Sequence, residues 1–219
     1  MTSASTGRKY RASEKRVQTR QQNSADIQAA AWRVFCSVGM DGANVRDIVK
    51  QSGLSPGTFY NYFKTKEAIF DVVAQDLFER LGEVTQAARA QARTLEELVD
   101  FAYRAYLDFV QTTEGAMEFI GRNQHHLRSQ IYPSEAISAI SRDLERDLRR
   151  FISSETMSDT EIALFAAMMI AAGAEALFCS TLKPRIGPTE LLAFLRTFIL
   201  QGSSGWVSRQ APRPFANDA

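Results

Sequence analysis

The sequence predicts a protein built entirely of α-helices, and three observations support this fold class. Apolar residues recur three and four positions apart in nearly every segment, which is the spacing of one helix face. Thr94 and Ser158 each stand three positions before a glutamate, a pattern that begins helices. No segment alternates between apolar and polar residues for long enough to predict a strand.

The first third of the chain predicts four helices separated by short turns. The first has an apolar face that includes Ile27 and Phe35, and it ends at Gly39. Asn44 is a suitable N-cap for the second, and Ser55 followed by Pro56 begins the third. The predicted helices are therefore one that ends at 39, one over 45–52, a very short one from 56, and one from about 65 towards 81.

The remaining chain predicts five longer helices with clear boundaries. The Thr94 and Ser158 patterns each open one helix, prolines end or begin others, and Thr189 is expected to cap the last. The predicted ranges are roughly 95–113, 114–130, 134–153, 159–182 and 189–202.

One of these helices is long and apolar enough to cross a membrane. The segment 162–182 has a single charged residue, Glu175. It follows a capping pattern, is rich in alanine, and lacks a flanking basic or aromatic belt. We therefore expect a helix of a soluble protein, buried on one side by its own domain and on the other by a partner subunit.

The charge of the chain is unevenly distributed. Its 219 residues carry 26 Lys and Arg against 25 Asp and Glu, a net charge of +1. Residues 1–66 hold 11 basic and four acidic residues, or +7, whereas the remainder holds 15 basic and 21 acidic residues, or −6. A basic head on an acidic body is expected when only one end of a protein meets a polyanion.

Composition excludes several classes of protein. A hydrophobic fraction of 45% is too high for a disordered chain, and two cysteines, Cys36 and Cys179, build no disulfide framework. No cluster of Cys and His predicts a metal site, and no cofactor motif is present. The beginning of the sequence has no apolar stretch typical of a secretion signal, so a cytoplasmic protein is expected.

The segment from residue 44 to 63 predicts a helix-turn-helix. Gly53 supplies the turn, and the second helix would present its N-terminal residues to base edges in the major groove of DNA. Gly57 permits close approach of a DNA backbone, and Lys66 would hold a phosphate. Phe59 and Phe63 are expected in the core. The side chains with hydroxyl, amide or ring groups for DNA are Thr58, Tyr60, Asn61 and Tyr62.

The first 80 or so residues resemble the DNA-binding domain of the TetR/AcrR family of transcriptional regulators. The similarity lies in the stretch VFCSVGMDGANVRDIVKQSGLSPGTFYNYFKTKEAIFDVV. The family usually has Thr or Ser at the position of Asn44, and often His at that of Tyr62. Together with the side chains named above, the resemblance gives DNA-binding candidates Asn44, Arg46, Ser55, Gly57, Thr58, Tyr60, Asn61, Tyr62 and Lys66.

The resemblance also implies an organisation and a mode of action. A helical effector-binding and dimerisation domain would follow the DNA-binding domain, with the last two helices forming a homodimer interface. The DNA target would then be a palindromic operator. The implied domains are a flexible basic tail at 1–20, the DNA-binding domain at 21–66, the effector and dimerisation domain at 67–206, and a tail at 207–219.

An effector site is expected among the aromatic and polar residues of the second domain. The polar cluster from Phe119 to His126 could hold an anionic group on an apolar ligand, although a solvated helix face explains it equally well. Glu175 must be paired, exposed at an edge, or in contact with a ligand. The ligand-binding candidates are Phe109, Phe119, Arg122, Asn123, His126, Glu175 and Phe178.

These observations leave two functions open and argue against a third. The first is a repressor released from DNA by a small, largely apolar effector: a fatty acid or acyl-CoA by faint similarity of residues 118–151 to family members that sense them, or a drug-like or aromatic compound. The second is a DNA-binding regulator that acts through a protein partner without an effector. An enzyme is not expected, because the two histidines, His125 and His126, are adjacent and point about 100° apart on a helix.

Overall fold

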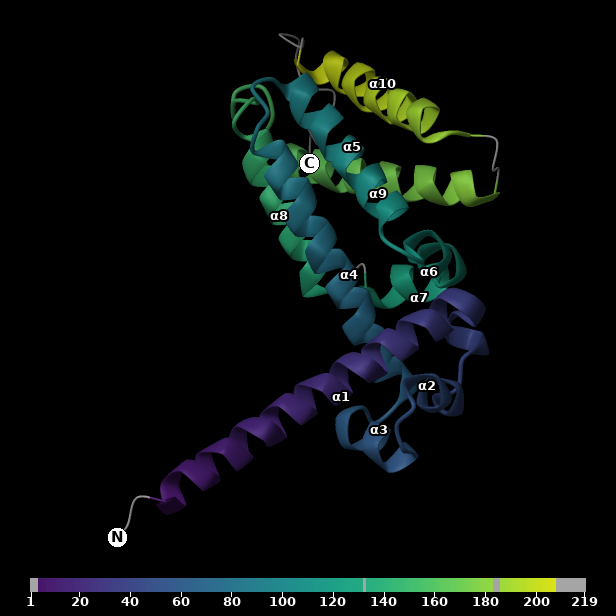
Figure 1. Ribbon diagram of the computed structural model, residues 1–219. Coiled ribbons are helices and arrows are strands. Elements are labelled where there is room, and N and C mark those ends of the chain that lie inside the picture. The colour runs from purple at the N-terminus through teal and green to yellow at the C-terminus, as the bar shows by residue number, and fades with distance from the viewer. Residues whose placement is uncertain (1–3, 132, 183–185, 208–219) are drawn as a thin grey trace, which may run out of the picture. The chain divides into compact units, whose positions relative to one another are not determined.

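The computed structural model describes residues 4–131, 133–182 and 186–207, and this part of the chain contains helices and no strand (Figure 1). The predicted all-α class is confirmed. The elements are α1 (Ala4–Gly42), α2 (Val45–Ser52), α3 (Pro56–Tyr62), α4 (Lys66–Arg89), α5 (Leu95–Thr112), α6 (Ala116–Arg122), α7 (Gln124–His126), a π-helix (Leu127–Ile131), α8 (Glu135–Leu148), α9 (Asp159–Leu182) and α10 (Pro188–Val207).

The chain divides into two compact units. The N-terminal unit comprises Met1–Asp76 together with Glu118–Gln130, and the C-terminal unit comprises Leu77–Met117 together with Ile131–Ala219. The boundary therefore lies inside α4, ten residues beyond the predicted domain end at 66. The first unit also takes in a segment that the sequence placed in the second domain.

The N-terminal unit is built on α1, against which α2 packs, and α3 follows in contact with α2. Its helical backbone begins at Ala4, so helix extends through much of the segment predicted as a tail. At the other end, Gly39 has φ of 71°, which interrupts the helical geometry where the sequence predicted a stop. The fully buried side chains that form the core of this unit are Ile27, Phe35, Ile48, Phe59, Ile69, Phe70 and Phe119.

The segment 114–130 is not the single helix that the sequence predicted. It forms α6, then breaks at Asn123, and continues as the short α7 and the π-helix. The break has a physical cause, because the Asn123 side chain is buried and bonds to the backbone of α1. Its Oδ1 accepts from the Met40 amide at 2.6 Å, and its Nδ2 donates to the Phe35 carbonyl at 3.2 Å and the Phe119 carbonyl at 2.7 Å.

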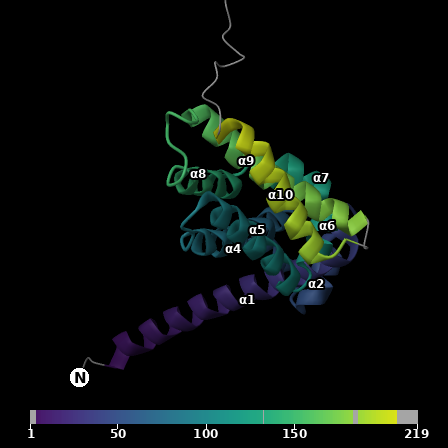
Figure 2. The ribbon, with the colours of Figure 1, turned by 90° about the horizontal axis from the view of Figure 1, so that it is seen from above.

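The C-terminal unit consists of the second half of α4 with α5, α8, α9 and α10. Figures 1 and 2 show α9 and α10 side by side, and α10 also contacts α5. The predicted capping box at Ser158 is formed, since Ser158 and Glu161 bond reciprocally. At the other predicted box the Thr94 hydroxyl accepts from the Glu97 amide at 3.1 Å, but the Glu97 carboxylate accepts from the Arg93 amide at 2.7 Å in place of Thr94. Fully buried side chains of this unit include Leu98, Val99, Leu148, Ile162 and Leu195.

Four predicted helix boundaries differ from the structure, and one of them is the end of the last helix, which lies at Val207 and not near 202. The helix α4 runs to Arg89, eight residues beyond the predicted end, because residues after 81 still bury Thr85 and Arg89 against their own unit. The helix α8 ends at Leu148, and hydrogen-bonded turns over residues 149–152 replace the predicted end of the helix at 153. The helix α10 begins at Pro188, so Thr189 lies inside it and is not its cap.

The helix α9 meets the length and hydropathy of a membrane span over Asp159–Thr181, with a mean hydropathy of 2.1. Within its own unit it buries Ile162, Ala166 and Met169. On another face Leu164 and Met168 are 61% and 57% exposed. One face is thus covered by its own unit, as predicted, and an apolar face is left on the surface.

Candidate nucleic-acid interface and effector cavity

The two residues predicted as N-caps, Asn44 and Ser55, begin α2 and α3 by accepting hydrogen bonds from backbone amides. Asn44 has an extended backbone, and its side chain accepts from the Asp47 amide at 3.1 Å. Ser55 does the same for Thr58, also at 3.1 Å. Gly53, with φ of 70°, ends α2 in the left-handed conformation that glycine adopts without strain. These contacts set the direction of α3.

One face of α3 is buried and the other carries exposed polar side chains. Phe59 is fully buried and Phe63 nearly so, as predicted, which anchors the helix to the core. Tyr60 is 47% exposed, and its ring rests edge-on against Phe59 at 5.4 Å between centroids. Asn61 is exposed beside it. A short anchored helix thus presents a tyrosine and an amide to the solvent.

The start of α3 is open to a partner. A Cβ built on Gly57 would meet only the Ser55 hydroxyl, at 3.9 Å, so nothing in the fold itself requires glycine there. The Ser55 and Thr58 hydroxyls lie 2.9 Å apart and are exposed or half-buried. Pro56 has no amide hydrogen and the Thr58 and Phe59 amides bond to Ser55, so the Gly57 amide is the one in this turn that suits a phosphate, and Gly57 leaves room for one to approach.

A groove of about 800 Å³ runs between α3 and residues 15–23 of α1. It joins three predicted DNA contacts to three basic residues that the sequence placed in a flexible basic tail. The signal that could have found them is the helical spacing of Arg16 and Arg20, one turn apart along α1. Its lining is Lys15, Arg16, Thr19, Arg20, Asn23, Thr58, Asn61 and Tyr62.

Lys66, predicted to hold a phosphate, has a second role. Its ammonium donates to the carbonyls of Met40 at 2.8 Å and Ala43 at 2.9 Å, and so closes the C-terminal end of α1. An ammonium has three donors, which leaves one for a phosphate. Arg46, in the first turn of α2, is exposed.

Four of the predicted ligand residues lie in the N-terminal unit. Phe119 is stacked between Trp32 and Phe70, with ring centroids 4.5 and 5.4 Å away. Asn123 makes the three backbone bonds described above, and the exposed Arg122 precedes it.

The fourth, His126, bonds to Asp41 at the end of α1. Its Nε2 lies 2.9 Å from the Asp41 carboxylate, and this hydrogen bond, with the charge of the imidazole, lowers the pKa of Asp41 below its usual 3.8. Phe119, Asn123 and His126 therefore all attach the segment 118–130 to α1.

The C-terminal unit contains an apolar cavity of about 100 Å³ between α4, α5, α8 and α9. Tyr103 is part of its wall, but its hydroxyl is already used, donating to the Met169 carbonyl at 2.9 Å; burial raises the pKa of this phenol. The predicted Phe109, Glu175 and Phe178 belong to this unit but do not line the cavity. Its lining is Phe78, Leu81, Thr85, Arg89, Ala102, Tyr103, Tyr106, Ile137, Ile140, Leu144, Met169, Ile170, Gly173 and Ala174.

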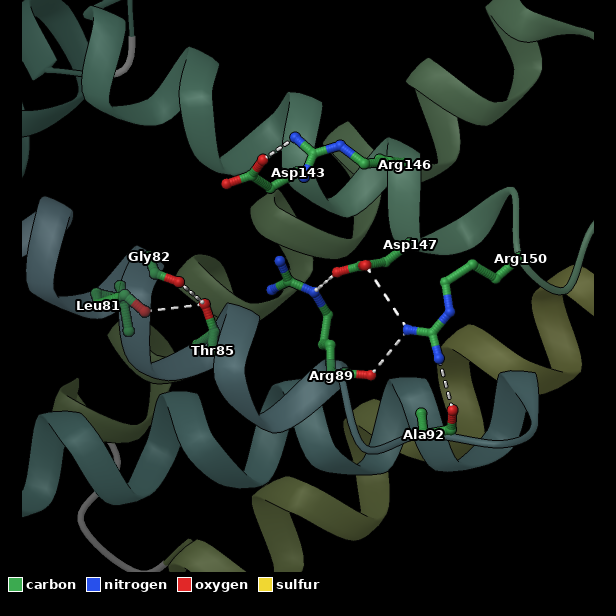
Figure 3. A network of polar contacts seen from close by, with 9 residues as sticks. All are labelled: Leu81, Gly82, Thr85, Arg89, Ala92, Asp143, Arg146, Asp147 and Arg150. Carbon is green, nitrogen blue, oxygen red and sulfur yellow. Dashed lines mark hydrogen bonds and ion pairs between the residues drawn. The ribbon is translucent and has the colours of Figure 1, made fainter.

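One charged side chain, Arg89, stands in this apolar wall. Figure 3 shows its guanidinium between α4 and α8, where Nε donates to the Asp147 carboxylate at 2.8 Å. Arg150 lies on the other side of that carboxylate, 3.7 Å away, and donates to the carbonyls of Arg89 at 3.2 Å and Ala92 at 2.8 Å. The end of α4 is thereby tied to the end of α8. Sequence reasoning had proposed none of these residues as a ligand candidate.

Comparison with known sequences places the strongest similarity in the helix-turn-helix region. The profile of the bacterial regulatory proteins of the tetR family matches residues 27–73. The repressor KstR2 of Rhodococcus jostii is 32% identical over 79 residues, covering 34% of this chain and 39% of that protein. The regulator PksA of Bacillus subtilis is 28% identical over 102 residues, covering 47% and 43%. The chain thus matches less than half the length of either relative.

Solved structures extend the likeness to most of the chain. The fatty acid degradation regulator FadR of Bacillus halodurans aligns with a TM-score of 0.68 at 19% identity, covering 81% of this chain and 94% of that one. FadR of Bacillus subtilis, solved in complex with stearoyl-CoA, aligns with a TM-score of 0.64 at 19% identity, covering 84% and 97%. At this identity the likeness is one of fold. Both predicted regions, a helix-turn-helix and a larger helical domain, have counterparts in that fold.

Proposed function

Because the chain belongs to the TetR family of transcriptional regulators, we propose that it is a repressor which binds a palindromic operator as a homodimer and is released by a small, largely apolar ligand. The observation that carries the proposal is the exposed face of α3, anchored by Phe59 and bordered by the basic groove on α1. The sign and position of these charges fit a phosphate backbone beside a base-reading helix.

The division of labour within this surface follows from chemistry. Tyr60 and Asn61 on the exposed face of α3 are the side chains that would reach base edges in the major groove. The basic side chains of the groove would bind phosphates and set the register of the protein on the duplex. Asn44 and Ser55 would act mainly by holding α2 and α3 in place, since both side-chain oxygens already accept backbone amides.

A homodimer is supported by apolar surface on the last two helices. Leu164 and Met168 on α9, and Phe194 and Phe198 on α10, are each more than half exposed. A groove of about 300 Å³ lies between the two helices and includes three of these four side chains. Two-fold pairing of such a face buries it, and places two copies of α3 to read two half-sites.

An effector is supported by the apolar cavity and by the relatives. FadR of Bacillus subtilis binds stearoyl-CoA in its solved structure, and a similarly folded chain has a place for an apolar ligand among α4, α5, α8 and α9. The cavity of about 100 Å³ is smaller than the roughly 300 to 1,000 Å³ of ordinary ligand pockets. A ligand much larger than a few carbon atoms would therefore have to displace the half-buried Tyr106 and Ile140.

The test begins with selection of genomic fragments that bind the purified full-length chain. We expect recovered fragments to share a palindrome, and Tyr60→Ala to weaken binding at least tenfold while dimer and helix content stay unchanged. Val84→Ala, an exposed side chain of the C-terminal unit, is the matched control and should bind like the wild type. If Tyr60→Ala binds the fragment with unchanged affinity, α3 is not the reading helix.

The second arm tests release. Fatty acids, acyl-CoAs and aromatic compounds are added to the protein and operator complex, and the fraction of bound DNA is measured. Loss of the complex with one class supports an effector-released repressor. Retention of the complex with every compound, together with co-purification of a protein partner, would replace the effector by the second hypothesis, a regulator that acts through that partner.

A further inference from the structure

We propose that Arg89 is the anion-recognising residue of the cavity and that the ligand is a free carboxylic acid with an apolar body. This inference rests on the proposed function for its biological meaning, but its evidence is the arrangement of α4 and α8. Arg89 is the only residue with a formal charge in the lining of the cavity, and only 3% of its side chain is exposed.

The donor inventory of Arg89 is incomplete in the described structure. A guanidinium carries five N–H groups. One of them, on Nε, bonds to Asp147, and no dashed line in Figure 3 reaches the two terminal nitrogens. Buried charge is stabilised when its donors are satisfied and is costly when they are not. The terminal nitrogens at the wall of an apolar cavity are thus suited to an acceptor that enters with the ligand.

The shape of the free donors selects the class of ligand. The planar fork of a guanidinium matches a carboxylate with two parallel bonds. The rest of the cavity is formed by aliphatic and aromatic side chains, with Thr85 the only hydroxyl besides the tyrosines, and that hydroxyl donates to Leu81 at 2.9 Å. A ligand with its carboxylate at Arg89 and its apolar body toward Ile137 and Met169 would match both the guanidinium and the apolar lining. A thioester carries no carboxylate at the same end of its acyl chain, so the free acid is favoured over its CoA ester.

Asp147 would compete with a ligand carboxylate for the guanidinium of Arg89. Its carboxylate takes Nε of Arg89 and lies between Arg89 and Arg150. A ligand carboxylate that draws the guanidinium toward the cavity weakens that ion pair and leaves Asp147 to Arg150. Because Arg150 also holds the carbonyls of Arg89 and Ala92, an anion in the cavity acts on the last turn of α4.

This competition predicts opposite effects from the two partners. Arg89→Met removes the fork and should lower the affinity for octanoate at least tenfold, with little change for octanol. Asp147→Asn keeps the shape of the side chain, removes the competing charge, and should raise the affinity for octanoate several-fold. Arg146→Gln on α8, an exposed arginine outside the cavity lining, is the matched control and should leave both affinities unchanged.

The experiment uses the full-length protein without DNA and isothermal titration with butyrate, octanoate, laurate and benzoate, the corresponding alcohols, and octanoyl-CoA. The readout is the ratio of acid to alcohol affinity, which a general loss of packing does not change. The proposal is supported if at least one acid binds the wild type tenfold better than its alcohol and if Arg89→Met abolishes that preference. It is overturned if no acid is preferred, if octanoyl-CoA binds better than octanoate, or if Asp147→Asn lowers the preference.

The outcome for the proposed function is separate. Release of the operator by some ligand with no preference for acids would leave the repressor standing and remove Arg89 from the site. A strong preference for acids in a protein that binds no palindromic DNA would support Arg89 as the anion-recognising residue and contradict the proposed repressor.

Discussion

The N-terminal and C-terminal units expose opposite kinds of surface. Around α3 the exposed side chains are polar, and the neighbouring groove is basic, whereas α9 and α10 expose leucine, methionine and phenylalanine. The charge has the same sense, because the N-terminal unit holds 13 basic and eight acidic residues, or +5, and the C-terminal unit holds 13 basic and 17 acidic residues, or −4. Each unit has buried what it needs for its own core, and what it leaves outside indicates its partner: a polyanion for one and an apolar surface for the other.

The largest effect is expected from placing a charge on the apolar surface of the C-terminal unit. Met168 is 57% exposed in the single chain, so Met168→Glu should leave the fold intact while preventing two chains from pairing. Operator affinity should fall about 100-fold or more, because each chain then binds one half-site without the other. Ultracentrifugation and fluorescence anisotropy measure both effects.

Val84→Glu provides the control for this change. Val84 is an apolar residue of the same unit with 42% exposure, and it lies on α4 rather than on α9 or α10. A monomeric Val84→Glu, or a dimeric Met168→Glu, would show that the exposed face of α9 is not the surface that pairs.

The next effect concerns how the N-terminal unit is held together. Asn123→Ala removes three hydrogen bonds and leaves the buried Met40 amide and Phe35 carbonyl without these partners. The free energy of unfolding should fall by about 3 kcal/mol, since each unsatisfied buried group costs on the order of 1 to 3 kcal/mol. Asn61→Ala, an exposed amide of the same unit, should change stability by less than about 0.5 kcal/mol. Equal effects in chemical denaturation would contradict a supporting role for Asn123.

A smaller effect is expected from the basic groove. Changing Lys15, Arg16 and Arg20 together to glutamine should reduce the slope of log affinity against log salt by about 2.7, because each phosphate contact releases close to one counterion. The same change at three exposed arginines of the C-terminal unit should leave the slope unaltered. A slope that responds equally to both triple variants would mean that α1 has no special place on DNA. The control positions are Arg142, Arg146 and Arg149.

The smallest effect is a pH dependence at the end of α1. His126 lowers the pKa of Asp41, so ionised Asp41 favours the folded state at pH values above its ordinary 3.8, and this contribution is lost as the pH falls through the lowered value. In His126→Ala the pKa of Asp41, followed by NMR, should rise towards 3.8. His125→Ala should change it much less, because His125 acts on Asp41 only through weaker charge interaction. If the pKa of Asp41 does not rise in His126→Ala, the hydrogen bond between His126 and Asp41 is not formed in solution.

Local signals predicted the helix-turn-helix well. The N-caps Asn44 and Ser55 each bond to an amide three positions further on, and the turn at Gly53 depends on its own backbone conformation; the structure confirms all three. The same holds for the capping box at Ser158. Interactions of this range can be recognised in one sequence because backbone geometry fixes which side chains meet.

Features that depend on distant residues could not be predicted in this way. Asn123 breaks a helix because of partners 83 and 88 positions away, and without them its surroundings have helical periodicity. Arg89 and Asp147 are 58 positions apart, and each alone is typical of a solvated helix face. Their pairing depends on how α4 and α8 pack. For the same reason none of the ligand candidates named from the sequence lines that cavity, and their roles stay predictions.

The attachment of residues 118–130 to α1 determines where the gene can be cut and rejoined. A hybrid regulator that exchanged only residues 1–66 would bring a foreign α1 to Asn123, Phe119 and His126, whose partners in this chain are the backbone at Phe35 and Met40, the ring of Trp32 and the carboxylate of Asp41. A hybrid in which segment 118–130 is exchanged together with residues 1–66 would keep these contacts, because both sides of each contact come from the same protein. The interchangeable module of this regulator is therefore discontinuous in its coding sequence.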